Sequence, residues 1–177
     1  MSGVKRKQRM PGAGPVKRTR PRGLSALHQE QIEDSRQRIL SAAEAAFTRN
    51  SYGATPVDAI ITIAGVSRAT FYKYFNNKFD LARDAQTDRI VRAMDNPYVS
   101  IIAHPTGRLL GQREPYAVNI DRLIAAAKER HCCLEINAEP DRLDLNDIHA
   151  KAAKEMGVKL AISTDAHATH ALGYMRF

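Results

Sequence analysis

Two histidines and one aspartate in the second half of the chain are of the residue types that bind metal ions. His104 follows an apolar run, and Asp165 and His167 form an Asp-x-His pair after another such run. Imidazole nitrogens and carboxylate oxygens can ligate Zn²⁺ or Mn²⁺. An isolated Asp-x-His pair, however, more often takes part in capping or lies at the polar surface. The spacing therefore leaves a metal site and ordinary surface chemistry open as interpretations.

A second group of side chains, in the segment GVSRATFYKYFNNK at 65–78, is suited to binding nucleic acid. Arginine can read guanine, alanine and a threonine methyl group can touch the methyl group of thymine, and tyrosine or lysine can hold phosphates. The simpler alternative is that Tyr72 and Tyr74 pack on a small helical core and that Lys73 is a solvated surface charge. The elements around this segment favour DNA binding.

The first of these elements is an amphipathic helix that begins near Ser35. Ile39, Ala43 and Phe47 recur every four residues, so they share one face, while charged residues occupy the other faces. The polar and glycine residues at 50–53 are typical of a helix end. This pattern predicts a core-facing helix over about 35–50.

Two short helices and a turn should follow. Thr55 can cap a second helix that Gly65 ends, and Ser67 is a suitable N-cap for a third. Phe71 and Phe75 lie four residues apart on this third helix and should face the hydrophobic core. Helix, short turn and helix is the spacing of a helix-turn-helix, whose second helix presents its N-terminal residues to the major groove.

Residues 35–82 resemble the DNA-binding domain of TetR-type transcriptional repressors, with the AGVS turn, the TFYKYF segment and the following lysine of that family. The resemblance implies double-stranded DNA as the partner and no cofactor for this half of the chain. The residues that it places at or near DNA-contacting positions are Thr55, Arg68, Ala69, Thr70, Tyr72, Lys73, Tyr74 and Lys78.

Repressors of this type continue with a helical domain that binds a small ligand and forms a homodimer. After Pro97 this chain instead alternates strands and helices, and no such helical domain can be built from the pattern. Strands are predicted at 98–103, 133–136 and 158–163, and helices at 120–131 and 147–156. This order implies parallel strands with crossover helices. A homodimer is possible, but the usual dimerisation domain is absent from the pattern.

Residues from about 87 to 177 resemble the C-terminal half of a PHP domain, the polymerase and histidinol phosphatase superfamily. The motifs are HPTGRLL at 104–110, LEINAEPDRLDLND at 134–147 and STDAH at 163–167, and the likeness is nearest to bacterial family-X DNA polymerases. It implies part of a distorted (β/α)₇ barrel that hydrolyses phosphoesters, with Mn²⁺ or Zn²⁺ as cofactor.

By this resemblance His104, Asp165 and His167 align with metal ligands, while Glu135 and Arg142 lie in family motifs and can be structural. The family's first half supplies an HxH pair and further ligands that this chain lacks. Whether the chain is an enzyme therefore stays open, and no catalytic residue is assigned.

The net charge of +8 is confined to the N-terminus. Eight of the 27 Lys and Arg lie in residues 1–23, which contain no acidic residue, so the other 154 residues are formally neutral. A disordered basic arm gains affinity for polyphosphates through counterion release, although it can also be only a solubilising tail.

Cellular location is indicated by two features. No apolar run approaches the ~20 residues that span a bilayer. The adjacent Cys132 and Cys133 cannot form an ordinary structural disulfide, which favours a reducing, cytoplasmic location.

We therefore predict a mixed fold, an all-α helix-turn-helix bundle followed by an α/β segment equivalent to about half of a PHP (β/α)₇ barrel. The predicted domains are a disordered arm over 1–23, the helix-turn-helix over 24–85 and a truncated PHP-like segment over 86–177. The predicted function is DNA-binding transcriptional regulation. The alternative is a metal-dependent phosphoesterase or exonuclease module associated with a family-X polymerase, inactive as truncated. The junction near 83–87 falls inside a predicted helix, which indicates a chimeric chain.

Overall fold

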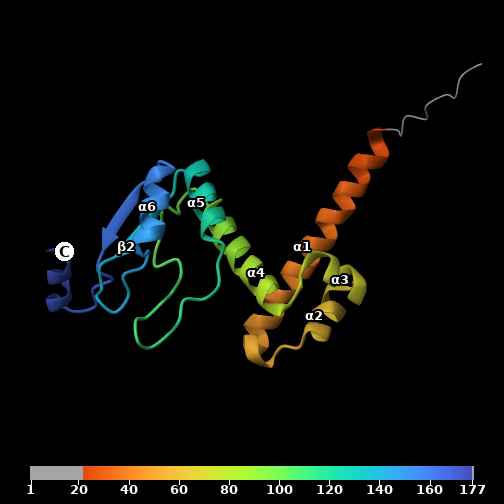
Figure 1. The fold of residues 1–177 in the computed structure, drawn as a ribbon, viewed down its shortest axis with the longest axis horizontal. Coiled ribbons are helices and arrows are strands. Elements are labelled where there is room, and N and C mark those ends of the chain that lie inside the picture. The colour runs from red at the N-terminus through yellow and green to blue at the C-terminus, as the bar shows by residue number, and fades with distance from the viewer. Residues whose placement is uncertain (1–21, 177) are drawn as a thin grey trace, which may run out of the picture.

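A computed structural model of the chain describes residues 22–176 and shows a helical region followed by an α/β region (Figure 1). The basic arm predicted over 1–23 lies almost wholly outside the described residues. Among the described helices, none is both long and apolar enough to cross a membrane.

The helical region consists of α1 (Arg22–Ala54), α2 (Val57–Ala64), α3 (Arg68–Tyr74) and α4 (Lys78–Ala93). Helix α1 begins at Arg22, earlier than the predicted start near Ser35, and is kinked at Ser51, where φ is 63°. The predicted helix end over 50–53 thus coincides with a kink, and the chain continues helically for one short turn.

Local signals in the sequence account for the other helix boundaries. Gly65 ends α2 in the left-handed conformation, and the Oγ atom of Ser67 accepts a hydrogen bond from the Thr70 backbone amide at 3.0 Å. The side chain of Asn77 accepts in the same way from Asp80 N at 2.8 Å and so caps α4. The predicted cap at Ser67 and the predicted break at Gly65 are both confirmed.

A hydrophobic core holds the four helices together. Ile39 of α1, Ile60 of α2 and Leu81 of α4 are fully buried in it, together with Phe71 and Phe75. The aromatic rings of Phe71 and Phe75 lie 5.9 Å apart. This arrangement confirms that the two phenylalanines face inward.

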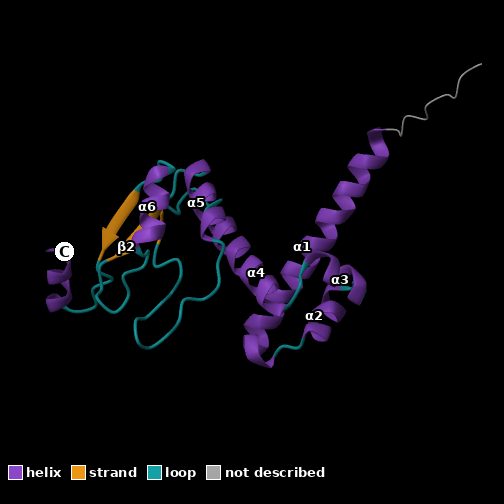
Figure 2. Ribbon diagram, in the orientation of Figure 1, coloured by secondary structure: helices purple, strands orange, loops and turns teal. Residues whose placement is uncertain are grey.

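The α/β region contains three strands and two α-helices (Figure 2). The strands are β1 (Ile101–Ile102), β2 (Cys133–Asn137) and β3 (Leu160–Ser163), in the order β1-β2-β3 and all parallel. The helices are α5 (Ile120–Glu129) and α6 (Asp147–Glu155), and a 3₁₀ helix follows at Thr169–Arg176.

The predicted alternation of parallel strands and helices is confirmed, and both cysteines are free. The first strand is shorter than the predicted 98–103, since only Ile101 and Ile102 pair, with Cys133 and Leu134. Equivalence to half of a (β/α)₇ barrel stays a prediction.

Helix α4 belongs to both regions. Its first half places Leu81 and Ala85 in the core of the helical region. The Met94 side chain, at its C-cap, lies in a separate core with buried residues of α5, α6 and β2, and Ile90 packs against that core. The predicted junction near 83–87 therefore lies within one uninterrupted helix.

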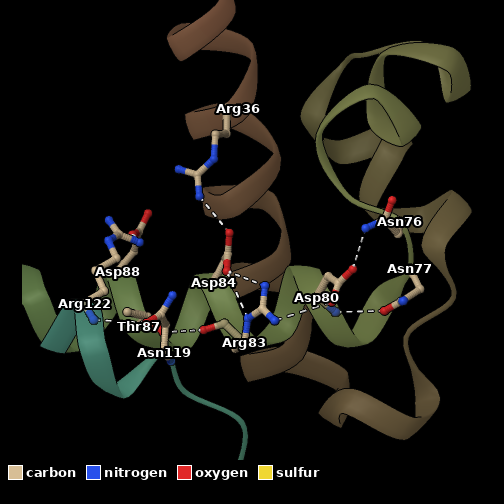
Figure 3. A network of polar contacts seen from close by, with 10 residues as sticks. All are labelled: Arg36, Asn76, Asn77, Asp80, Arg83, Asp84, Thr87, Asp88, Asn119 and Arg122. Carbon is tan, nitrogen blue, oxygen red and sulfur yellow. Dashed lines mark hydrogen bonds and ion pairs between the residues drawn. The ribbon is translucent and has the colours of Figure 1, made fainter. Parts of the chain in front are cut away.

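Polar contacts fix α5 against α4 at this junction (Figure 3). The hydroxyl of Thr87, which is fully buried, donates to the Arg83 carbonyl at 2.7 Å and accepts from the Asn119 amide at 2.9 Å. Asp88 forms an ion pair with Arg122 of α5. One turn earlier on α4, Asp84 accepts a hydrogen bond from Arg36 of α1 at 2.8 Å. The two regions thus share a hydrogen-bonded as well as an apolar joint.

Candidate nucleic-acid interface

The outer face of α3 carries the side chains predicted to contact DNA. Arg68, Ala69, Tyr72 and Lys73 are all exposed. The Tyr72 side chain is among the exposed large apolar groups, and the Arg68 side chain is 62% exposed and ion-paired with Asp58 of α2. The structure therefore brings these four side chains together on one short helix.

The position of α3 is set by its cap and its inward face. Besides capping the helix through the Thr70 amide, Ser67 Oγ lies 2.8 Å from the Thr70 hydroxyl, so that hydroxyl is partly engaged within the turn. Tyr74 is half-buried against the helical core, and the Lys73 ammonium lies 5.7 Å from its ring centroid. Of the two tyrosines, Tyr74 therefore packs and Tyr72 faces outward.

Thr55 has a different place from the predicted one. Its side chain is only 1% exposed, and its hydroxyl donates to the Ser51 carbonyl of α1 at 2.7 Å. The residue that precedes α2 is Pro56, without a side-chain cap. The prediction that Thr55 caps the second helix is wrong because its hydroxyl is used at the end of the first, and the burial leaves no side-chain surface for DNA.

Lys78 is also engaged inside the protein. Its ammonium donates to the backbone carbonyls of Tyr52 and Thr55, both at 3.0 Å, and lies 4.5 Å from the Tyr52 ring centroid. A cation near the carboxyl end of a helix satisfies orphan carbonyl groups there. In this structure Lys78 joins α4 to the end of α1 and does not project freely toward a phosphate.

Arg38 is a structural residue of the interface that the sequence analysis missed. Its guanidinium donates to the carbonyls of Ala64 at 2.6 Å and Gly65 at 2.9 Å, at the turn between α2 and α3. A Cβ atom at Gly65 would lie 2.9 Å from this guanidinium. Gly65 and Ser67 signalled the turn itself, but nothing local pointed to a residue 26 positions earlier.

The predicted metal ligands lie at the carboxyl end of the sheet but are engaged separately. The His104 amide donates to Glu135 at 2.6 Å, and its ring Nδ1 lies 3.4 Å from the same carboxylate. Asp165 Oδ2 lies 3.7 Å from Arg142 Nε, and His167 Nδ1 lies 2.6 Å from the Asp165 backbone carbonyl.

Within residues 22–176, no three side chains of His, Cys, Asp or Glu form a group that could hold a metal ion. The donors present do not form a set that fits the implied Mn²⁺ or Zn²⁺, and the Asp165 carboxylate lies against the Arg142 guanidinium. The metal-ligand assignment stays a prediction.

Asp144 and Glu135 are instead the buried acids that organise this end of the sheet. Asp144 accepts hydrogen bonds from the amides of Thr106 at 3.0 Å and Gly107 at 2.9 Å, and Glu135 accepts from the Ser163 hydroxyl. Gly107 has φ of 61°, and a Cβ there would lie 2.2 Å from the Tyr116 ring. Asp144 was not among the predicted site residues, and the available signal for it was an acidic residue between two leucines.

The comparisons with known proteins fall into two sets, one for each region. Residues 39–85 match the family described as bacterial regulatory proteins, tetR family. The chain is 36% identical over 55 residues to the HTH-type transcriptional regulator TtgR of Pseudomonas putida, which is 31% of this chain and 26% of that protein.

The other set contains a polymerase and phosphatases. The DNA polymerase/3'-5' exonuclease PolX of Bacillus subtilis (strain 168) is 49% identical over 88 residues, 50% of this chain and 15% of that protein. A probable phosphatase of Thermoanaerobacter sp. (strain X514) is 36% identical over 105 residues, 56% of this chain and 40% of that protein. The chain spans less than half the length of each relative, and both resemblances drawn from its sequence are confirmed.

Proposed function

We propose that the chain is a transcriptional regulator that binds double-stranded DNA with α3 in the major groove. The observation that supports this most is the exposed face of α3, on which Arg68 and Tyr72 project from a capped helix anchored by the buried Phe71. The match of residues 39–85 to the tetR family also supports DNA binding. Such a protein would act in the cytoplasm with the DNA.

Charge on this surface defines the expected contacts. Arg68 and Lys73 are exposed cations on α3, and Asp58 pairs with Arg68 in the free protein. A guanine edge can replace this carboxylate as the partner of the guanidinium, since guanine offers two acceptors in the major groove. Tyr72 is placed to donate its hydroxyl to a phosphate or to contact a base edge.

Replacing both Arg68 and Tyr72 by alanine should weaken binding to a selected duplex by about 10- to 100-fold, because a base contact and a backbone contact are lost. A duplex is first selected from a random-sequence library with the full chain, and affinity is then measured by fluorescence anisotropy over a series of salt concentrations. Affinity of the unsubstituted chain should fall steeply with salt.

The matched control removes an exposed tyrosine and an exposed cation from the α/β region, with Tyr98→Ala and Lys151→Ala in one chain. This variant should bind like the unsubstituted protein. If the α3 variant binds normally while deletion of residues 1–23 abolishes binding, the basic arm is responsible and the assignment to α3 is wrong.

A second proposal concerns the α/β region, and the 49% identity to PolX over 88 residues favours it. We infer that this region is a PHP-type phosphoesterase segment that lacks turnover in this chain, because Asp165 pairs with Arg142 and no described set of ligands converges. A metal centre that activates water needs several ligands held in a fixed geometry.

We expect the chain, loaded with Mn²⁺ or Zn²⁺ and dialysed, to retain less than a stoichiometric amount of metal. Elemental analysis of the unsubstituted chain and of His104→Ala provides the measurement, and a DNA oligonucleotide provides the substrate for an assay of nucleotide release. Stoichiometric metal together with Mn²⁺-dependent release, both lost in His104→Ala, would show instead that the segment is an active phosphoesterase.

A further inference from the structure

A pocket of about 620 Å³ lies where the helical region meets the loop before α5. The end of α1, one side of α4 from Phe79 to Arg89, and residues 115–117 line it. Its volume falls in the range of small-molecule sites, which are mostly apolar with a few polar groups. Neither DNA binding nor phosphoester chemistry, as proposed above, uses this pocket.

The walls of the pocket are aromatic. Phe47 and Tyr52 of α1 lie with ring centroids 5.4 Å apart, Phe79 contributes from α4, and Tyr116 contributes from the loop. Phe79 is 56% exposed, so a large apolar surface is open to a ligand. Aromatic rings from three elements around one space favour a planar aromatic occupant.

The polar part of the pocket is supplied by α4. Arg89 is exposed and lines both this pocket and an adjoining hollow of about 210 Å³. Neighbouring carboxylates are engaged elsewhere, since Asp88 pairs with Arg122 and Glu44 with Arg92. No ion pair of Arg89 is found among residues 22–176, so its guanidinium can take an external anion.

Tyr116 is held in the wall that the loop before α5 forms. Its backbone amide donates to the Thr106 carbonyl at 3.1 Å, and its ring lies over Gly107. Burial, followed by the nearby Asp144 carboxylate, raises the pKa of its hydroxyl, so the phenol stays neutral at ordinary pH. Tyr116 therefore adds no negative charge that would compete with an anion for Arg89.

We propose that this pocket binds a small planar aromatic anion, with its ring between Phe79 and Tyr116 and its carboxylate or sulfonate on Arg89. Stacking on the aromatic walls supplies the apolar part of the affinity, and the guanidinium gives a charge-assisted, bidentate hydrogen bond. The inference does not depend on the DNA-binding proposal, because none of these residues lies on α3.

The test uses 2-naphthoate as the anionic probe and 2-naphthylmethanol as its neutral counterpart. The sequence contains no tryptophan, so naphthalene fluorescence can be followed without indole emission. The full chain should bind 2-naphthoate saturably at one site. Arg89→Gln should weaken 2-naphthoate by about tenfold or more and leave 2-naphthylmethanol nearly unchanged, because only the charged contact is removed.

Two further variants test whether the probes bind in this pocket. Phe79→Ala should weaken both probes, whereas Lys151→Gln, which removes an exposed positive charge from α6, should change neither. Circular dichroism and thermal unfolding establish that each variant is folded. Absence of saturable binding, or equal losses of 2-naphthoate affinity in Arg89→Gln and Lys151→Gln, would overturn the proposal.

Discussion

Replacing Phe71 by alanine should lower the free energy of unfolding of the helical region by about 3–5 kcal/mol. The side chain is completely buried, and its ring lies 5.2 Å from that of Tyr72 and 5.9 Å from that of Phe75. Truncation removes apolar contact and leaves a cavity that the surrounding helices cannot fill without moving. Denaturant unfolding followed by circular dichroism measures the loss.

Phe79→Ala is the matched control, since Phe79 belongs to the same bundle but is more than half exposed. We expect that substitution to change the free energy of unfolding by less than about 1 kcal/mol. Hydrogen exchange resolved along the chain should place the loss caused by Phe71→Ala in α1 to α3. Equal destabilisation by the two substitutions would mean that Phe71 is not the anchor of the DNA-facing helix.

The boundaries and inward faces of the helix-turn-helix could be predicted because they depend on near neighbours. A cap such as Ser67 acts on an amide three residues away, and Phe71 and Phe75 share a face through helical periodicity alone. The start of α1 could not be found in this way, since the stretch before Ser35 lacks an apolar period.

Roles that depend on distant residues were the ones that sequence reasoning missed or misplaced. Thr55 was expected to cap α2 and to approach DNA, yet the kink at Ser51 turns a carbonyl toward its hydroxyl. Lys78 and Arg38 cap helices that lie 26 residues away along the chain, a distance at which no spacing rule applies. Exposed positions on α3 were predictable because exposure follows from periodicity.

In the α/β region, too, features set by near neighbours were predictable and features set by distant residues were not. Parallel strands followed from the alternation of apolar runs and helices, and the register of Leu134 with Leu160 follows from burial on the helix-covered face. The short β1 could not be foreseen, because pairing and not composition limits it to Ile101 and Ile102. Metal ligation at His104 was implied by resemblance, but nothing in the sequence placed Arg142 beside Asp165.

Replacing Asp144 by alanine should destabilise the α/β region by about 2–5 kcal/mol, because two buried backbone amides lose their acceptor. The carboxylate is fully buried and accepts from Thr106 and Gly107, which fixes the loop after β1 to the segment before α6. Gly107 is itself packed under the Tyr116 ring, so loss of the acceptor should also loosen the loop that carries Tyr116. Thermal unfolding and hydrogen exchange measure both effects.

Asp144→Asn removes the charge but keeps an acceptor, because the side-chain oxygen of asparagine can still accept a hydrogen bond from one or both of these backbone N–H groups. We expect Asp144→Asn to lower the free energy of unfolding by about half as much as Asp144→Ala, or less. The reason is that hydrogen bonds to a charged acceptor are about twice as strong as those to a neutral one. Asp141→Ala, which removes an exposed acid from the same segment, should be nearly neutral. The helical region should keep its own exchange protection in all three variants, because its core shares only α4 with the α/β region. If Asp144→Ala exposes α2 and α3 as fully as the loop, the two cores unfold as one cooperative unit and α4 transmits the loss between them.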